Sequence, residues 1–177
     1  IMILTLNQLE QISPYTGYKR LELILPNLNQ TMHKYEVSSN LRMVHFVTQL
    51  IIESNYFRYI QELGSGKQYD YKESLGNKHY GDGRRFIGRG YFKLVGRTEY
   101  EEYKKASGVD VVLYPHYANT PKVAMDIAGF LWKQKNLNML ADQDDLHGVT
   151  KLLTGGYIIM REREEVLNRT KQVIGLI

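Results

Sequence analysis

Apolar residues recur at intervals of three or four along most of the chain, which is the spacing of one face of an α-helix. This pattern predicts helices at residues 6–12, 21–35, 41 to about 59, 99–106, 121–132, 137–141, 146–153 and 161–173. Pro26 lies inside the second helix and should kink it or reset its start, because proline lacks a backbone N–H. The strongly apolar run from residue 41 onward is the expected core helix.

Polar residues that cap helix N-termini stand before several of these segments. They are Thr5, one of Ser38, Ser39 and Asn40, then Thr120 with Pro121, and Asp144 or Asp145. The mixed charges of the 161–173 segment are most simply the solvated face of a helix, with ion pairs between residues four positions apart.

Residues 64–96 have a different character, because they are rich in glycine, tyrosine and charge and contain few long apolar runs. We interpret them as a loop with a short β-hairpin, in which residues 85–87 pair with residues 91–94. Loops beside rigid helices are common places for functional sites. The glycines at 81–83 and 88–90 lack a Gly-Lys-Ser/Thr sequence and a strand–glycine–helix context, which disfavours a nucleotide site.

The composition is that of a globular protein, with 43% hydrophobic and 24% charged residues in a chain of 177. This length suits one domain, or one domain with two lobes. There is no cysteine, which excludes a disulfide scaffold, a thiol nucleophile and a cysteine metal site. The five histidines include no pair at helical ligand spacing, so we expect neither a metal nor another cofactor.

A net charge of +4 gives a mild preference for anionic partners, but the basic residues are scattered and form no nucleic-acid patch. No stretch approaches the roughly 18 consecutive apolar residues of a membrane span. The first five residues lack the basic start and long apolar core of a signal peptide. We therefore expect a monomer that is made in the cytoplasm without a signal peptide, with no nucleic-acid partner and no membrane insertion.

Two carboxylates are the first candidates for chemistry. Glu53 ends a strongly apolar run, and Glu62 follows nine residues later, just before Gly64-Ser65-Gly66. Paired carboxylates at a controlled distance hydrolyse glycosidic bonds. On one unbroken helix the two Cα atoms would lie roughly 13–14 Å apart on opposite sides. The helix must therefore end or bend after Ile60 if the pair serves one cleft; otherwise both are solvated helix glutamates.

Several motifs together resemble glycoside hydrolase family 19, most closely its short, loop-poor bacterial and phage chitinases and endolysins. These motifs are Leu-Thr-Leu-Asn-Gln-Leu at 4–9, Leu-Pro-Asn-Leu-Asn-Gln at 25–30, Leu-Gly-Asn at 75–77, Gly-Asp-Gly-Arg-Arg-Phe-Ile-Gly-Arg-Gly at 81–90, Gly-Arg at 96–97 with Tyr100, Thr-Pro at 120–121, Ala-Gly-Phe-Leu-Trp at 128–132, Leu-Asn at 137–138 and Gly-Gly at 155–156. The resemblance covers nearly the whole chain, and the lack of cysteine fits the bacterial branch.

The resemblance implies a mainly α, lysozyme-like, two-lobed helical fold with a small β-hairpin and a central cleft. It makes residues 1–177 a single catalytic domain without a separate wall-binding module. The implied activity is inverting hydrolysis of β-1,4 bonds in polymers that contain N-acetylglucosamine, either bacterial peptidoglycan or chitin. Glu53 matches the family's general acid and Glu62 its general base. The protein would act on the cell wall, in the periplasm or outside the cell after release.

The resemblance also assigns substrate-binding positions, several of which depart from the family pattern. These positions are Tyr91, Lys93, Val95, Thr154 and Arg163. Lys93 replaces a glutamine, Val95 replaces a hydroxyl that helps to place the catalytic water, and Thr154 replaces an asparagine. Ile52 replaces the histidine before the acid, and Ile158 replaces a later asparagine. Arg163 matches the family's arginine.

Each departure has a physical consequence for the site. Val95 cannot hold a water, and Lys93 could pair with Glu53 or Glu62 and lower the pKa of either carboxyl. Three hypotheses follow: an active wall hydrolase, an impaired relative that binds saccharide or a protein partner through the altered cleft, and an unrelated helical interaction protein. The scattered basic residues disfavour the third.

Overall fold

The computed structural model describes residues 3–177. The prediction that the first five residues are not a signal peptide therefore lies partly outside the described residues. The chain divides into two compact units, which are described separately. The first unit comprises Ile1–Arg58 and Gly129–Ile177, and the second comprises Tyr59–Ala128. Two compact units agree with the predicted two lobes.

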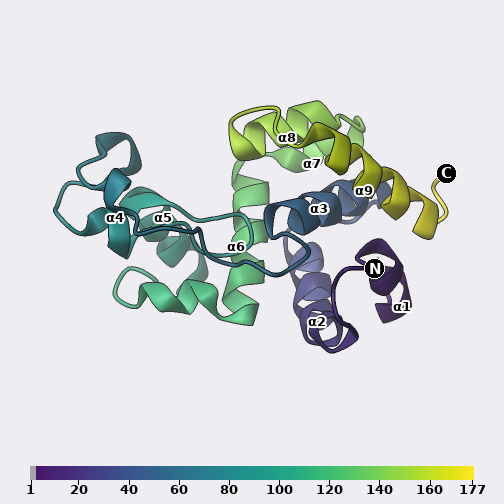
Figure 1. The fold of residues 1–177 in the computed structure, drawn as a ribbon, viewed down its shortest axis with the longest axis horizontal. Helices are drawn as coiled ribbons and strands as arrows, with labels where there is room; N and C mark the ends of the chain where they lie inside the picture. The colour runs from purple at the N-terminus through teal and green to yellow at the C-terminus, as the bar shows by residue number, and fades with distance from the viewer. Residues whose placement is uncertain (1–2) are drawn as a thin grey trace. The chain divides into compact units, whose positions relative to one another are not determined.

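Helices form most of the described chain (Figure 1). The α-helices are α1 (Leu6–Ile12), α2 (Tyr18–Lys34), α3 (Asn40–Glu53), α4 (Asp82–Arg85), α5 (Gly96–Ser107), α6 (Pro121–Gln134), α7 (Leu137–Asp142), α8 (Leu146–Thr154) and α9 (Met160–Val173). Three 3₁₀-helices accompany them, η1 (Lys67–Tyr69), η2 (Glu73–Leu75) and η3 (Pro115–Asn119). The prediction of a mainly α fold is confirmed.

The helix starts follow the capping residues of the sequence. Thr5 and Gln8 form a reciprocal capping box at α1, and Ser39 accepts the N–H of Arg42 at α3. Asp145 is the residue that caps α8, since its carboxylate accepts the N–H of Gly148. These caps satisfy N–H groups that have no partner within the helix.

Two helices differ from their predicted extents. Helix α2 runs through Pro26 as one element, so of the two effects predicted for this proline, a kink or a new start, the new start is wrong. Helix α3 ends at Glu53 rather than near Tyr59, because the backbone turns left-handed directly afterwards. The expected end or bend therefore comes seven residues earlier than Ile60.

Helix α3 is the core of the first unit and is buried on all its sides. Its buried residues run without a break: Met43, Val44, His45, Phe46, Val47, Thr48, Gln49, Leu50 and Ile51. Helix α9 lies alongside it in Figure 1, and α7 and α8 also contact it. On another side Phe46 meets Trp132 edge to face, with ring centroids 5.2 Å apart. A helix that is apolar all round belongs in the middle of a bundle.

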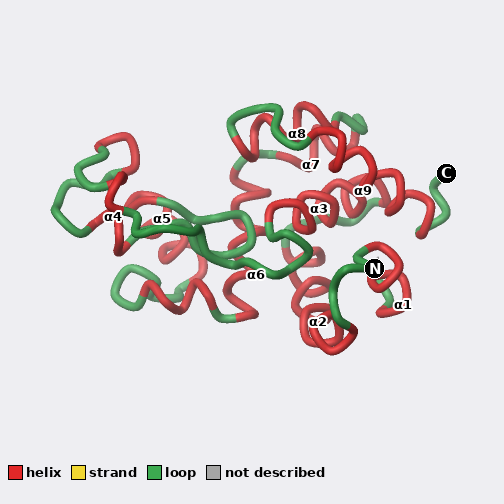
Figure 2. Tube along the Cα trace, viewed as in Figure 1, coloured by secondary structure: helices red, strands yellow, loops and turns green. Residues whose placement is uncertain are grey.

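The second unit consists of short helices and long loops, and Figure 2 shows helix and loop without strand in the described chain. The β-hairpin predicted at 85–94 is reduced to isolated antiparallel bridges, Gln61 with Arg89 and Arg89 with Leu94. Arg85 is helical and cannot begin a strand. Gly90 and Lys93 both have positive φ, which closes a tight turn instead of extending the pairing.

Buried polar groups hold these loops together. Asp82 is buried, and its carboxylate accepts bonds from Arg97 and from the N–H groups of Lys78 and His79. Burial alone would raise the pKa of Asp82, but these donors outweigh it and the pKa is lowered. Tyr100 donates to the carbonyl of Ile87 at 2.7 Å, and its burial raises its pKa to about 12.

Residues 3–177 contain neither a membrane-spanning helix nor a metal-binding cluster. None of their helices is both long and apolar enough to span a membrane. Their His, Asp and Glu side chains form no cluster of three that could bind a metal ion.

A buried histidine makes the first unit sensitive to pH. The His45 side chain is fully buried, and Nε2 lies 2.8 Å from Asp144, which also accepts from Lys171. Burial lowers the pKa of His45 in spite of Asp144. As the pH falls, His45 is therefore protonated in the unfolded chain before it is protonated in the folded protein. The contribution of neutral His45 to the free energy of unfolding is complete above about pH 6.5 and is lost as the pH falls below that value.

We predict that the free energy of unfolding falls between about pH 7 and pH 5, above the range in which carboxylates titrate. Denaturant titrations at a series of pH values measure this slope. The His45→Gln variant should be less stable at neutral pH but should show a flatter profile. His33 is exposed, so His33→Gln should keep the wild-type slope. Equal slopes in all three proteins would contradict the prediction.

Candidate active site

Glu53 is placed by the end of α3, where the chain stops in a left-handed cap. The N–H of Tyr56 bonds to the carbonyl of Ile51 at 2.7 Å, and the N–H of Asn55 bonds to Ile52 at 3.2 Å. This pair of bonds is a Schellman cap, in which asparagine tolerates the left-handed position. Ser54 locks the cap, because its hydroxyl donates to Leu50 at 2.5 Å and accepts from Phe57 at 2.7 Å.

The cap is strained and is held from outside. Asn55, Tyr56 and Phe57 have φ of 47°, 58° and 61°, a conformation that costs about 1–2 kcal/mol for each residue with a side chain. Thr16 donates to the carbonyl of Tyr56 at 3.0 Å, and Arg20 donates to that of Phe57 at 3.3 Å. Strain of this kind is found most often at functional sites.

A buried arginine orients the Glu53 carboxylate. Arg163 of α9 has no exposed side-chain surface, and it forms an ion pair with Oε1 of Glu53, which is 21% exposed. The same guanidinium donates to Gln49 and, through Nε, to the carbonyl of Ile158 at 3.0 Å. Gln49 in turn donates to Thr150 at 3.1 Å. The network ties α3, α8 and α9 together around one carboxylate.

The first unit also contains a small cavity of about 240 Å³. Its lining consists of Ile51, Ile52, Asn55, Tyr56, Ile159 and Glu162. Glu53 lies between these residues in the chain. The walls are mostly apolar, which suits contact with the carbon framework of a ligand.

Glu62 of the second unit is held by two donors. Its Oε1 accepts the hydroxyl of Tyr69 at 2.5 Å, and its Oε2 accepts the N–H of Gly88 at 3.3 Å. The bond to Glu62 raises the pKa of Tyr69. Asn77 is fully buried and fixes Tyr69 by donating to its carbonyl at 2.9 Å. Since an ionised carboxylate only accepts hydrogen bonds, this pair of donors suits the charged form of a glutamate.

Gly88 brings three predicted site residues together. A Cβ at Gly88 would lie 2.9 Å from Oε2 of Glu62 and 3.2 Å from side-chain carbons of both Lys93 and Val95. A side chain at this position would push the Glu62 carboxylate out of its place. The Lys93 ammonium donates to the carbonyls of Tyr59 at 3.3 Å and Gly90 at 3.2 Å.

The other predicted site residues, Tyr91, Thr154 and Arg163, are engaged mostly in contacts within the protein. Tyr91 is 5% exposed, so little of its surface can reach a ligand. The Thr154 hydroxyl lies within hydrogen-bond distance of the carbonyls of Thr150 and Gly156, at 2.9 and 3.0 Å, and closes the end of α8. Arg163 is buried and forms an ion pair with Glu53, whereas the charge pattern of its helix predicted a solvated position.

Three residues that position the glutamates were not predicted. Gln49 is a buried amide in an apolar helix, and a lone glutamine within such a run was the available signal. Tyr69 was only one of the many tyrosines of residues 64–96, and Gly88 was only part of a glycine motif. Their bonds to Glu62 depend on loop geometry, which hydrophobic periodicity does not encode.

The fold is that of known chitinases. Chitinase C from Streptomyces griseus is 17% identical, with a TM-score of 0.73 over 97% of this chain and 92% of that chain. A bacterial family 19 chitinase gives 15% identity and a TM-score of 0.73 over 98% and 96% of the two chains. A class IV chitinase from Zea mays gives 16% identity and a TM-score of 0.62 over 97% and 82%.

No family model matches the sequence. At such low identity the structural likeness shows the fold, which is the lysozyme-like, mainly helical fold predicted from the motifs.

The buried arginine gives a test of the first unit. We predict that Arg163→Met lowers the free energy of unfolding by about 3–5 kcal/mol, because one partner of a buried pair is left alone. Arg161→Met on the same helix is the matched control, since Arg161 is 87% exposed and pairs only with Glu165. Its effect should stay within about 0.5 kcal/mol. Urea unfolding of both variants measures the difference, and equal stabilities would refute the role of Arg163.

Proposed function

We propose that this protein is a glycoside hydrolase that cleaves β-1,4 bonds in polymers containing N-acetylglucosamine, with inversion at the anomeric carbon. Glu53 would be the general acid and Glu62 the general base. The observation that supports this most directly is that each glutamate is oriented by its own side-chain donor, the buried Arg163 for Glu53 and the half-buried Tyr69 for Glu62. The fold shared with chitinases agrees with the proposal.

The contacts of Glu53 distinguish its two carboxyl oxygens. Arg163 occupies Oε1, whereas Oε2 has no hydrogen-bond partner among residues 3–177. In the proposed reaction the proton is therefore carried on Oε2 and passes to the oxygen of the leaving sugar.

The contacts of Glu62 suit a base. Both oxygens are fixed by donors, and each keeps a second lone pair that can accept the proton of an attacking water. Inverting enzymes keep about 6.5–9.5 Å between their two carboxyls to fit this water. The proposed mechanism requires that spacing when the polymer is bound.

We propose a cell-wall or chitinous polymer as the substrate, acted on after the protein is released from the cytoplasm, as by an endolysin. No cofactor enters the proposed reaction, because two carboxyl groups and a water complete the proton transfers.

A second function is favoured by one observation. Val95 lies against Gly88 beside the Glu62 carboxylate, where an apolar side chain cannot hold a catalytic water. The alternative is therefore an impaired relative that binds saccharide or a protein partner without cutting. Lys93→Gln with Val95→Thr is the restoration that would reveal such a protein, because it should create turnover that the wild type lacks.

We predict that the wild type releases soluble fragments from purified peptidoglycan or reducing ends from chitin oligomers. Glu53→Gln and Glu62→Gln should each lower kcat by about 10²–10⁴, the usual contribution of a general acid or base. Glu22 is exposed on α2, and Glu22→Gln should retain full activity as the matched control.

Two outcomes of this assay would count against the proposal. No release by the wild type from either polymer would favour the binding alternative. Turnover that survives either glutamine substitution would remove that glutamate from the mechanism.

A further inference from the structure

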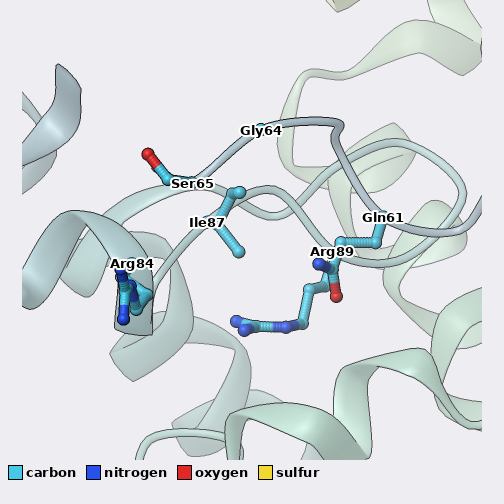
Figure 3. Close-up of a pocket in the computed structure, with 6 residues that line it drawn as sticks. All are labelled: Gln61, Gly64, Ser65, Arg84, Ile87 and Arg89. Atoms are coloured by element: carbon cyan, nitrogen blue, oxygen red, sulfur yellow. The ribbon is translucent and has the colours of Figure 1, made fainter. Parts of the chain in front are cut away.

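The second unit contains a pocket of about 290 Å³ that the proposed mechanism does not use (Figure 3). Its lining consists of Gln61, Gly64, Ser65, Arg84, Ile87 and Arg89. In Figure 3 the Arg89 side chain extends toward Arg84 beneath Ile87, so two guanidinium groups border one open space. The pocket walls include no carboxylate.

Both arginines have donors without a partner in the part of the chain that the structure describes. Other arginines of this protein, such as Arg42, Arg97 and Arg163, form ion pairs with carboxylates. Arg89 donates only through Nη1, to the carbonyl of Arg85 at 2.7 Å and to Tyr100 at 2.9 Å. Its Nε and Nη2 remain available, as does the whole guanidinium of Arg84.

The neutral groups of the pocket also present donors. The Gln61 oxygen accepts a bond from Asn119 at 2.7 Å, which leaves the Gln61 amide N–H groups to donate. Ser65 also lines the pocket, but in Figure 3 its hydroxyl points away from Arg84 and Arg89. Ile87 adds an apolar wall. Such a set of donors around a small apolar surface matches a carboxylate on a short carbon branch.

The pocket is preorganised by close backbone contacts. Gly66 and Gly83 approach so closely that a Cβ on Gly83 would clash with the Gly66 carbonyl oxygen. Asp70 accepts the N–H groups of Gly81 at 3.1 Å and Gly83 at 2.7 Å. These contacts hold the loop that carries Ser65 against the helix that carries Arg84, so a ligand would not have to order them.

The pocket and the candidate base share one backbone segment. Gln61 bridges to Arg89, and the next residue, Glu62, donates its N–H to Gly88 at 2.8 Å. Consecutive side chains of an extended segment point to opposite faces. The pocket and the Glu62 carboxylate therefore lie on the two sides of this segment, and only a branch that passes around the segment could enter the pocket while the glycan backbone lies at Glu62.

We propose that this pocket binds a carboxylate on a substituent of the glycan, which makes the substrate an acidic wall polymer and not neutral chitin. The inference rests on the proposed function, since it names the substrate class of that site. Two sources share the required chemistry: the lactyl carboxylate of N-acetylmuramic acid and a carboxylate of its attached peptide. A polymer of N-acetylglucosamine alone would offer no anion to Arg84 and Arg89.

The test measures binding by calorimetry in a Glu53→Gln background, so that turnover does not interfere. The ligands are chitotetraose, a tetrasaccharide alternating N-acetylglucosamine with N-acetylmuramic acid, and the same tetrasaccharide with its peptide stems. The readout is the ratio of the dissociation constants of the neutral and the carboxylated ligands. Arg84→Gln and the double variant with Arg89→Gln are compared with Lys105→Gln, which removes one exposed charge from α5.

We expect the carboxylated ligand to bind roughly tenfold more tightly than chitotetraose, as for one charge-assisted hydrogen bond. Arg84→Gln should reduce this ratio and the double variant should abolish it, whereas Lys105→Gln should preserve it. A preference seen with the lactyl tetrasaccharide identifies the lactyl group, and one that needs the stem identifies the peptide.

Equal affinities for neutral and carboxylated ligands, or a ratio that both arginine variants preserve, would overturn the inference. Hydrolysis by the otherwise unmodified protein separates this failure from that of the proposed function. Turnover without preference leaves the hydrolase standing and removes the pocket's role. Preference that depends on Arg84 without turnover leaves the pocket standing and removes the hydrolase.

Discussion

The buried guanidinium of Arg163 is the constraint on which the first unit depends. A charge with no exposed surface is tolerated only when it is paired and hydrogen-bonded, and here Glu53, Gln49 and the carbonyl of Ile158 share that task. Because these partners come from different segments, the same contacts of Arg163 fix both the packing of α3 against α9 and the orientation of Glu53. The candidate acid is thus part of the core network and not an attachment to the surface.

Glu62 is oriented by loop geometry, whereas Glu53 is oriented by a buried charge. Gly88 supplies both an N–H for the carboxylate and the space in which it lies, while Asn77 fixes the tyrosine that donates to the other oxygen. The two glutamates are therefore oriented by unlike means, one by an ion pair and one by neutral donors. Carboxylates in different environments can take different roles in one reaction. The assignment of Glu53 as the acid and Glu62 as the base comes from the family resemblance.

The sequence predicted most of the helices, because amphipathic periodicity and polar caps such as Thr5 and Ser39 are local signals. It misplaced the end of α3, because three successive left-handed residues leave no trace in hydrophobic spacing. The charges of α9 indicated a solvated face, yet Arg163 is buried, since only tertiary contact distinguishes it from Arg161. The glutamates came from chemistry and resemblance, whereas Gln49, Tyr69 and Gly88 required the structure.

The measurement that tests the central claim most directly is the anomeric configuration of the first product, followed by proton NMR during hydrolysis of a β-linked oligomer. A water activated by Glu62 on the face opposite the leaving sugar must give the α-anomer before mutarotation. The account predicts that the α-anomer appears first and then equilibrates. Initial release of the β-anomer would contradict it, because retention requires a nucleophile that attacks before water does.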